Sequence, residues 1–322
     1  MNLSIGITTS ASFEKVNWLT SFSDEMSVYG IWVGEDIDSL HDVFTLVSIF
    51  LLKTKSTKVG IGITSPLIRN ISTIARASAG LRELDHKERF MLGLGIGGLQ
   101  DLAKKGLVAD KPLQIIKDAA NLLRRIWLGE KVTSVGRFNL NNYSAKCDFN
   151  IPIYFGARGP KLLELAGEMA DGVIISGPRS YIERATSIVK EGLKRRKLDK
   201  NFTTVVWVPT ILIKDGKGIE MAREVVAIVV ADTPKRVLEL CKIDEEKAQK
   251  VRNAVLKLGV KEASKLVDEE LIRDFSIFGD AREVCKDFLS LEKYGVDEAV
   301  FGPPYGLSWK DSIESVVREW RS

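Results

Sequence analysis

The stretch IPIYFGARGPKLLELAGEMADGVIISG, residues 151–177, contains one complete repeat of a larger pattern. Residues 151–156 form a short apolar run with β-branched and aromatic side chains, which is typical of a buried strand. A Gly-Ala-Arg-Gly turn follows, and Pro160 then opens a helical pattern, since proline is tolerated in the first turn of a helix. A second apolar run covers 172–177. The stretch therefore predicts two parallel strands joined by a helix.

Similar apolar runs recur along the chain, and helical patterns separate them. They are continuous rather than alternating, as in strands that are buried on both faces. The eight predicted strands are 3–8, 30–34, 58–64, 90–95, 151–156, 172–177, 204–213 and 298–302. The predicted helices include 66–84, 160–169, 216–232, 281–293 and 309–320. Eight repeats favour an α/β fold of the (β/α)8 TIM-barrel class over an open doubly wound sheet.

The helix predicted at 66–84 shows the pattern most clearly. Its apolar face carries Leu67, Ile71, Ile74, Ser78 and Leu81, at spacings of three and four residues. Pro66 stands at its expected start, and the pair Thr64-Ser65 is expected to cap it.

We expect one barrel domain over residues 1–322, with two insertions. The segment 129–150 is polar and β-like, and the segment 233–275 is charged and helical. No Pro/Ser-rich linker sets either of them apart as a separate domain.

Composition excludes several classes of partner and site. Apolar residues make up 45% of the chain, and the net charge of +4 is spread without blocks of Lys/Arg and aromatics. We therefore expect no nucleic-acid partner. No run approaches the ~20 apolar residues of a membrane helix, and no signal peptide is visible. The three cysteines form no C-x-x-C pair, and His41 and His86 are the only histidines. These counts favour a reduced cytoplasmic compartment and no metal site.

Glycine gathers where the predicted strands end, which is the face on which (β/α)8 barrels bind ligands. The turn Gly156-Ala157-Arg158-Gly159 is the sharpest example. The helix that begins at Pro160 offers free N–H groups and a positive dipole end, and Arg158 adds a positive charge. The turn therefore predicts a phosphate-binding site, although an ordinary tight turn has the same residues.

Residues 93–98, GLGIGG, match the dinucleotide-binding pattern G-x-G-x-x-G. That interpretation requires a long helix next and an acidic residue about 20 positions later, at the end of a strand. Here a broken, loop-like segment follows, and Asp118 lies in a helical run. We therefore interpret the segment as a barrel strand whose glycines allow close approach of a flat ligand.

Four segments together resemble a known family: GIGITSPLIRN (60–70), GLGIGG (93–98), 151–174 and GVDEAVFGPPYG (295–306). They resemble the bacterial-luciferase-like superfamily, and specifically its F420-dependent methylenetetrahydromethanopterin reductases. The resemblance covers nearly the whole chain. It implies a (β/α)8 barrel that binds the deazaflavin F420 at its C-terminal face and transfers hydride at C5 of the deazaflavin. It also implies a homodimer.

The resemblance further implies a non-prolyl cis peptide in a bulge of the third strand, here the bond Gly62–Ile63; a plain strand end is the alternative. It assigns the following residues to the cofactor: Gly62, Ile63, Thr64 and Ser65 behind the ring; Gly95, Ile96 and Gly97 at its edge; Gly156, Ala157, Arg158, Gly159, Gly177 and Pro178 at the phosphate; and Thr8, where relatives carry an acid in the first strand.

After the second strand, relatives commonly carry an Asp-His pair, and this chain has Glu35 and Asp36 there. Two adjacent carboxylates raise each other's proton affinity, which suits a general acid. The alternative is an acidic pair that a helix dipole favours. Glu35 and Asp36 are the candidate catalytic residues.

The resulting hypothesis is an F420-dependent oxidoreductase that acts on a methylene-tetrahydropterin-type or related electrophilic small molecule. Two alternatives remain open: an FMN-dependent monooxygenase of the same superfamily, and a non-catalytic flavin-binding barrel. The non-catalytic alternative is motivated by two departures from the family: Asp36 stands where relatives carry a histidine, and the first strand lacks the acid.

Overall fold

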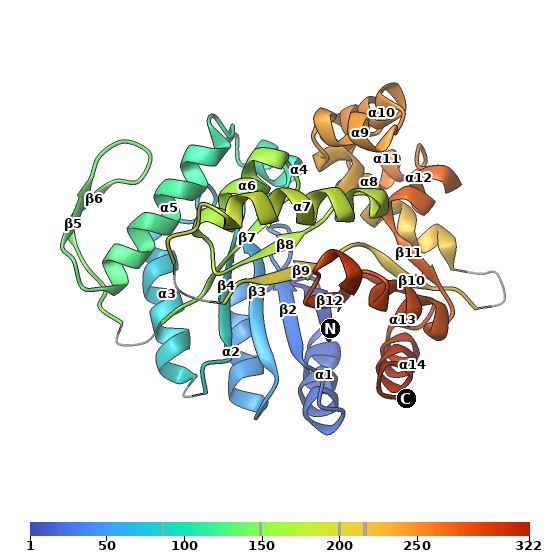
Figure 1. Ribbon diagram of the computed structural model, residues 1–322, viewed down its shortest axis with the longest axis horizontal. Helices are drawn as coiled ribbons and strands as arrows, with labels where there is room; N and C mark the ends of the chain where they lie inside the picture. Colours follow the sequence, from blue (N-terminus) through green and yellow to red (C-terminus); the bar gives the residue numbers. More distant parts are fainter. Residues whose placement is uncertain (86, 148–149, 199–200, 215–217) are drawn as a thin grey trace.

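The computed structural model describes residues 1–322 except 86, 148–149, 199–200 and 215–217, so His86 lies outside the described residues. Eight parallel strands close into a barrel in the order β1-β12-β9-β8-β7-β4-β3-β2 (Figure 1). They are β1 (Asn2–Thr8), β2 (Gly30–Gly34), β3 (Lys58–Thr64), β4 (Phe90–Leu94), β7 (Ile153–Ala157), β8 (Gly172–Ile175), β9 (Thr203–Val206) and β12 (Glu298–Phe301). Because β1 pairs with both β2 and β12, the sheet is closed, and the predicted (β/α)8 fold is confirmed.

Helices follow the barrel strands and cover their outer face. They are α1 (Phe13–Glu25), α2 (Val43–Lys53), α3 (Ile71–Leu84), α4 (Leu99–Lys104), α5 (Pro112–Trp127), α6 (Pro160–Met169), α7 (Ile182–Leu193), α13 (Ala281–Leu289) and α14 (Trp309–Arg321), with short 3-10 turns η1 (Arg179–Tyr181) and η3 (Glu292–Tyr294). No helix in the described part of the chain is both long enough and apolar enough to cross a membrane.

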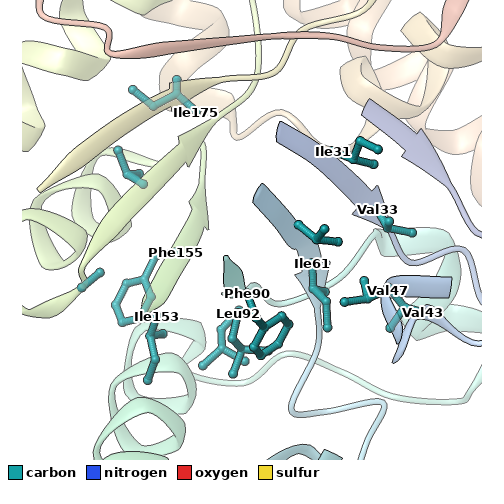
Figure 2. Close-up of a cluster of buried hydrophobic side chains, with 14 of the residues drawn as sticks. Ile31, Val33, Val43, Val47, Ile61, Phe90, Leu92, Ile153, Phe155 and Ile175 are labelled. Carbon is teal, nitrogen blue, oxygen red and sulfur yellow. The ribbon is translucent and has the colours of Figure 1, made fainter. Parts of the chain in front are cut away.

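The outer core lies between the strands and these helices. Alternate residues of a strand point to opposite faces, so Ile31 and Val33 of β2 point outward. They lie near Val43 and Val47 of α2, and all four are fully buried (Figure 2). Burying such side chains stabilises the fold by about 1.5–3 kcal/mol each.

The inner core contains an indole ring that adjacent glycines accommodate. Trp32 is fully buried inside the barrel, and a Cβ atom at Gly60 would overlap its ring. The other buried members of this inner cluster are Met91, Tyr154, Ile174, Val205 and Val300. Large side chains on some strands are thus matched by glycine on their neighbours, as the interior of a small barrel requires.

The predicted strand 204–213 is wrong as one element, because it divides into two strands of different sheets. β9 ends at Val206, and β10 (Thr210–Leu212) pairs with β11 (Ile277–Gly279) and β13 (Pro304–Gly306). Pro209 lies between the two and has no N–H to donate to a ladder. The division places Trp207 outside the barrel sheet, at its mouth.

The helix predicted from residue 66 begins at Ile71 instead, so the predicted cap is wrong. Asn70 is the N-cap, and its Oδ1 accepts the N–H of Ser72 at 2.9 Å. Ser65 donates its hydroxyl to the carbonyl oxygen of Ile96, at 2.6 Å. The predicted apolar face is confirmed within the helix, where Ile71, Ile74, Ser78 and Leu81 are buried.

Two segments extend beyond the barrel repeat. The first contains the antiparallel hairpin of β5 (Val132–Ser134) and β6 (Leu140–Tyr143). The second contains α9 (Lys235–Cys241), α10 (Glu245–Leu258), α11 (Val260–Ser264) and α12 (Glu269–Phe275). These helices lie together above the barrel in Figure 1, beside α8 (Ala222–Asp232), which follows the 3-10 turn η2 (Ile219–Met221). Together with Ile211 they form a second hydrophobic core.

Candidate active site

The end of β3 forms the centre of the barrel mouth. The Gly62–Ile63 peptide bond is cis, and the register with β4 shifts between Ile61 and Thr64, so the expected bulge and its cis bond are confirmed. The Ile63 side chain fills the space beside two glycines of neighbouring strands. A Cβ atom at Gly95 would lie 2.7 Å from Ile63 Cγ1, and one at Gly156 would lie 2.6 Å from Ile63 Cγ2. The bulge therefore brings the ends of three strands together.

Trp207 lies beside Ile63 and crosses the mouth of the barrel. A Cβ atom at Gly62 would lie 2.9 Å from its Cζ3, and one at Gly302 would overlap its Nε1. Ile63 and Trp207 are both partly exposed and pack on the buried inner cluster. We call these two side chains the apolar bed. A flat apolar surface at this place suits a planar aromatic ligand.

Glu35 lies next to the bulge and forms a buried polar network. Its Oε2 accepts a hydrogen bond from the Thr64 hydroxyl at 2.6 Å, and its Oε1 accepts one from Arg69 Nε at 2.7 Å. Arg69 Nη2 contacts both Glu35 Oε1 and Asp42 Oδ2. The carboxylate is 7% exposed and the guanidinium 20% exposed. Glu35 is thus held by a counter-charge and by the residue that follows the bulge.

Arg69 joins this network to the start of α2. Asp42 is the N-cap of α2, and the Arg69 guanidinium lies 5.3 Å from the ring centroid of Phe44. Burial lowers the pKa of Arg69, but the hydrogen bonds and charges of Glu35 and Asp42 outweigh burial and raise that pKa above its ordinary value. The guanidinium therefore carries its charge at every working pH.

Asp36 faces a different carboxylate. Its backbone N–H donates to Thr9 Oγ1 at 2.9 Å. Burial, and then the charges of Asp36 and Asp232, raise the pKa of Asp101 from 3.8 to about 6. Glu35 thus has an arginine partner, and the charge of Asp36 acts on Asp101.

The predicted phosphate turn is completed by the helical segment above the barrel. Arg158 Nη1 lies 3.2 Å from Asp232 Oδ2, and Arg158 Nε donates to Ser176 Oγ at 3.4 Å. Asp232 Oδ1 also accepts the N–H of Leu99, at 2.9 Å. The helix α6 begins after Gly159, as predicted, and its first N–H groups face out of the helix end. Arg158 thus already has a carboxylate partner beside the proposed phosphate site.

The outcome for the other predicted cofactor residues is as follows. Gly177 has a φ of +133° and open space where a Cβ would be, so backbone is accessible there. Gly97 has a φ of +99°, and a Cβ on it would contact Ser65 and Ile68. Ala157 is buried, and Pro178 precedes the 3-10 turn η1. The hydroxyl groups of Thr8 and Ser10 form a hydrogen bond with each other. Thr8 and Pro178 have no described contact with the bulge or with the Glu35 network.

Four residues of the mouth were missed by sequence reasoning. Arg69 lies inside the quoted segment 60–70, and Asp101 lies three positions after GLGIGG; the charge of each residue was the available signal. Trp207 lies inside the predicted strand 204–213, which gives no sign of its place at the mouth. Asp232 is 74 positions from Arg158 and gave no local signal.

The site fits a planar cofactor and offers no metal-binding cluster in the described chain. Cβ atoms at Gly95 and Gly156 would meet Ile63, and one at Gly62 would meet Trp207 and Trp32, so glycine at these positions makes room for the apolar bed. Among the described residues, no three or more histidine, cysteine, aspartate or glutamate side chains are arranged to hold a metal ion.

The sequence profile of the family described as luciferase-like monooxygenase matches residues 8–298. A 5,10-methylenetetrahydromethanopterin reductase of Archaeoglobus fulgidus is 31% identical over 99% of this chain and 98% of its own. One from Methanolobus tindarius is 30% identical over 95% of each chain. The structure of the coenzyme F420 dependent tetrahydromethanopterin reductase of Methanopyrus kandleri has a TM-score of 0.82 at 28% identity, with 99% of this chain and 97% of that chain covered. By its closed barrel and by these matches, the chain belongs to the luciferase-like monooxygenase family.

Proposed function

We propose that this chain is an F420-dependent oxidoreductase that moves hydride between F420 and a methylene-tetrahydropterin-type or related electrophilic small molecule. The observation that carries the proposal is the apolar bed of Ile63 and Trp207 at the mouth of the barrel. Its support is the similarity, over nearly the whole chain, to reductases described as F420-dependent.

F420, when bound, supplies the hydride-carrying deazaflavin, and the protein supplies position and charge. In this proposal Ile63 and Trp207 support the ring, while Gly95 and Gly97 allow approach at its edge. Thr64 and Glu35 hold the bulge in place from behind.

The phosphate end is assigned to the turn Gly156–Gly159 and to Gly177. Open backbone at Gly177 and the start of α6 favour an anion there. Arg158 adds a guanidinium at the same turn, and Asp232 holds it in one orientation.

Proton handling is assigned to Asp36 and Asp101. The pKa of Asp101, raised to about 6 by burial and by nearby carboxylates, lets this group hold or release a proton near neutral pH. Glu35 remains the acceptor that Thr64 and Arg69 share.

The test is a titration of the purified protein with F420 and, in parallel, with FMN, followed by cofactor fluorescence. We expect saturable binding of F420 and none of FMN over the same range. Tight FMN binding without a response to F420 would favour the monooxygenase alternative. Consumption of reduced F420 with methylenetetrahydromethanopterin, followed by absorbance, tests the substrate class. F420 binding without turnover of any such substrate would favour the non-catalytic alternative.

Three further features belong to the proposal. We infer a cytoplasmic homodimer, on the strength of the family resemblance, and sedimentation of the purified protein tests the dimer. Residues 1–322 are proposed to fold as one domain with insertions near 129–150 and 233–275. A single cooperative unfolding transition is the expected result, and two separate transitions would contradict it.

A further inference from the structure

We infer that Arg69 is a positioning residue for the proposed reaction: it holds the Glu35 carboxylate against Thr64 and thereby fixes the cofactor-facing bulge of β3. The inference rests on the proposed function, because the bulge matters only if a cofactor lies on the apolar bed.

The contacts form one continuous path. Arg69 donates to Glu35 through two guanidinium nitrogens, and Glu35 accepts the Thr64 hydroxyl on its other oxygen. Thr64 is fully buried and follows Ile63, whose side chain is half of the apolar bed. A displacement of the carboxylate therefore reaches the bed through a single residue.

The charge balance makes Arg69 necessary. The Glu35 side chain is 7% exposed, so water cannot replace its counter-charge. A buried carboxylate without a partner is strongly disfavoured, and such a group takes up a proton instead. With Arg69 in place, two guanidinium nitrogens contact the same oxygen, Glu35 Oε1, and the single ammonium of a lysine cannot reproduce this geometry.

The groups around Glu35 come from three segments. Arg69 and Thr64 face it from the end of β3 and the turn that follows, and Asp36 is its neighbour in the chain. Asp42, at the start of α2, competes for Arg69 and is 43% exposed. Arg69 is the one described partner of Glu35 that carries a positive charge, so its removal leaves this carboxylate without a counter-charge among the described contacts.

The experiment compares Arg69→Met, Arg69→Lys, Glu35→Gln and the double variant Arg69→Met/Glu35→Gln with the wild type. Arg125→Met is the matched control, since Arg125 lies on α5 and forms an exposed pair with Glu130. Two properties are measured between about pH 5 and pH 8. They are the melting temperature of the cofactor-free protein and the dissociation constant of F420, followed by fluorescence.

We expect the melting temperature of Arg69→Met to fall further below that of the wild type at pH 8 than at pH 5, because charge on a buried carboxylate without a partner is disfavoured and a higher pH favours the charged form. The double variant should lose this pH dependence, since its amide does not titrate. F420 should bind Arg69→Met about tenfold more weakly at pH 8, and Arg69→Lys should lie between it and the wild type.

Arg69→Met that behaves like Arg125→Met in both properties would overturn the inference. A pH-dependent loss that persists in the double variant would also overturn it, because the titrating group would then not be Glu35. If Arg69→Met does not fold, Arg69→Lys and the double variant decide the matter in the same way. Failure of the wild type to bind F420 would instead refute the proposed function, while the melting data would still measure the Arg69–Glu35 coupling.

Discussion

The two sides of the barrel mouth are built in different ways. On the β3 side, Glu35, Thr64 and Arg69 lie within 35 positions of each other and are largely buried. On the β7 side, Arg158 is completed by Asp232, which lies far along the chain at the end of α8. The side that supports the proposed ring is therefore part of the barrel itself. The side assigned to the phosphate depends on the helices above the barrel.

This difference predicts different consequences of mutation. Changes on the β3 side disturb packed backbone and buried charge, so they should lower the stability of the protein. On the β7 side, Arg158 and Asp232 are 25% and 11% exposed, which is close to the exposure of Arg69 and Glu35. Because Arg158 lies at the turn assigned to the phosphate, changes there should lower ligand affinity, and they should lower stability less than changes to the packed backbone of the β3 side.

The largest effect is expected at Gly93, on β4 beside the bulge. A Cβ atom there would overlap the carbonyl oxygen of Ile61, which is backbone and cannot move aside. Gly93→Ala should lower the free energy of unfolding by about 3 kcal/mol. Chemical denaturation measures this change in unfolding free energy. Gly80→Ala is the control, because Gly80 lies in α3 with open space around it and should gain about 0.5–1 kcal/mol. Equal unfolding free energies of the two variants would contradict the claim that the backbone beside the bulge is tightly packed.

Thr64→Val tests the same side with a smaller expected loss of stability. It keeps the shape of the buried side chain and removes the hydrogen bond to Glu35, so we expect a loss of about 1–2 kcal/mol in unfolding free energy. Thr186→Val is the control, since that hydroxyl donates to the carbonyl oxygen of Glu183 on the same helix, α7, far from the bulge in the chain. A loss no larger than that of the control would show that the Thr64–Glu35 bond does not hold the bulge.

On the opposite side, Arg158→Ala should weaken F420 binding by about tenfold and change the melting temperature little. Fluorescence titration and thermal melting of the same sample separate the two effects. Asp232→Ala should weaken binding by less, because it loosens Arg158 without removing it. A large drop in stability with unchanged affinity would reverse the comparison between the two sides.

The smallest effect concerns Asp101 and pH. Its pKa is raised to about 6 in the folded protein, against an ordinary value of 3.8, so the folded state prefers the protonated carboxyl. Its stabilising contribution is present at low pH and is lost as pH rises through about 6. Asp101→Asn should therefore be more stable than the wild type by about 1 kcal/mol at pH 7, since partial exposure screens the charges. Denaturation curves of both proteins at pH 4 and pH 7 are the measurement, and a constant difference would contradict the assignment.

Much of the fold could be predicted from the sequence because buried parallel strands are continuous apolar runs. The runs 30–34 and 58–64 coincide with β2 and β3 to the residue. Pro209 was the available signal that the run 204–213 divides, and it was not used. The later start of α3 depends on Asn70, whose side chain caps the helix better than the distant Ser65 does.

The candidate site was predictable only where its residues are neighbours in the chain. The bulge at Gly62–Ile63 and the turn at Arg158 are local patterns. The pairing of Glu35 with Arg69, the position of Trp207 and the contact of Asp232 with Arg158 depend on how distant strand ends meet. Charge and residue type alone do not specify which carboxylate an arginine selects.

The most direct test of the central claim is a crystal structure of the protein with F420 bound. The account predicts that the deazaflavin ring lies on Ile63 and Trp207, in van der Waals contact with the Gly62–Ile63 bulge, and that the phosphate lies at the turn Gly156–Gly159. A ring bound away from the apolar bed, with Ile63 and Trp207 uncovered, would contradict it.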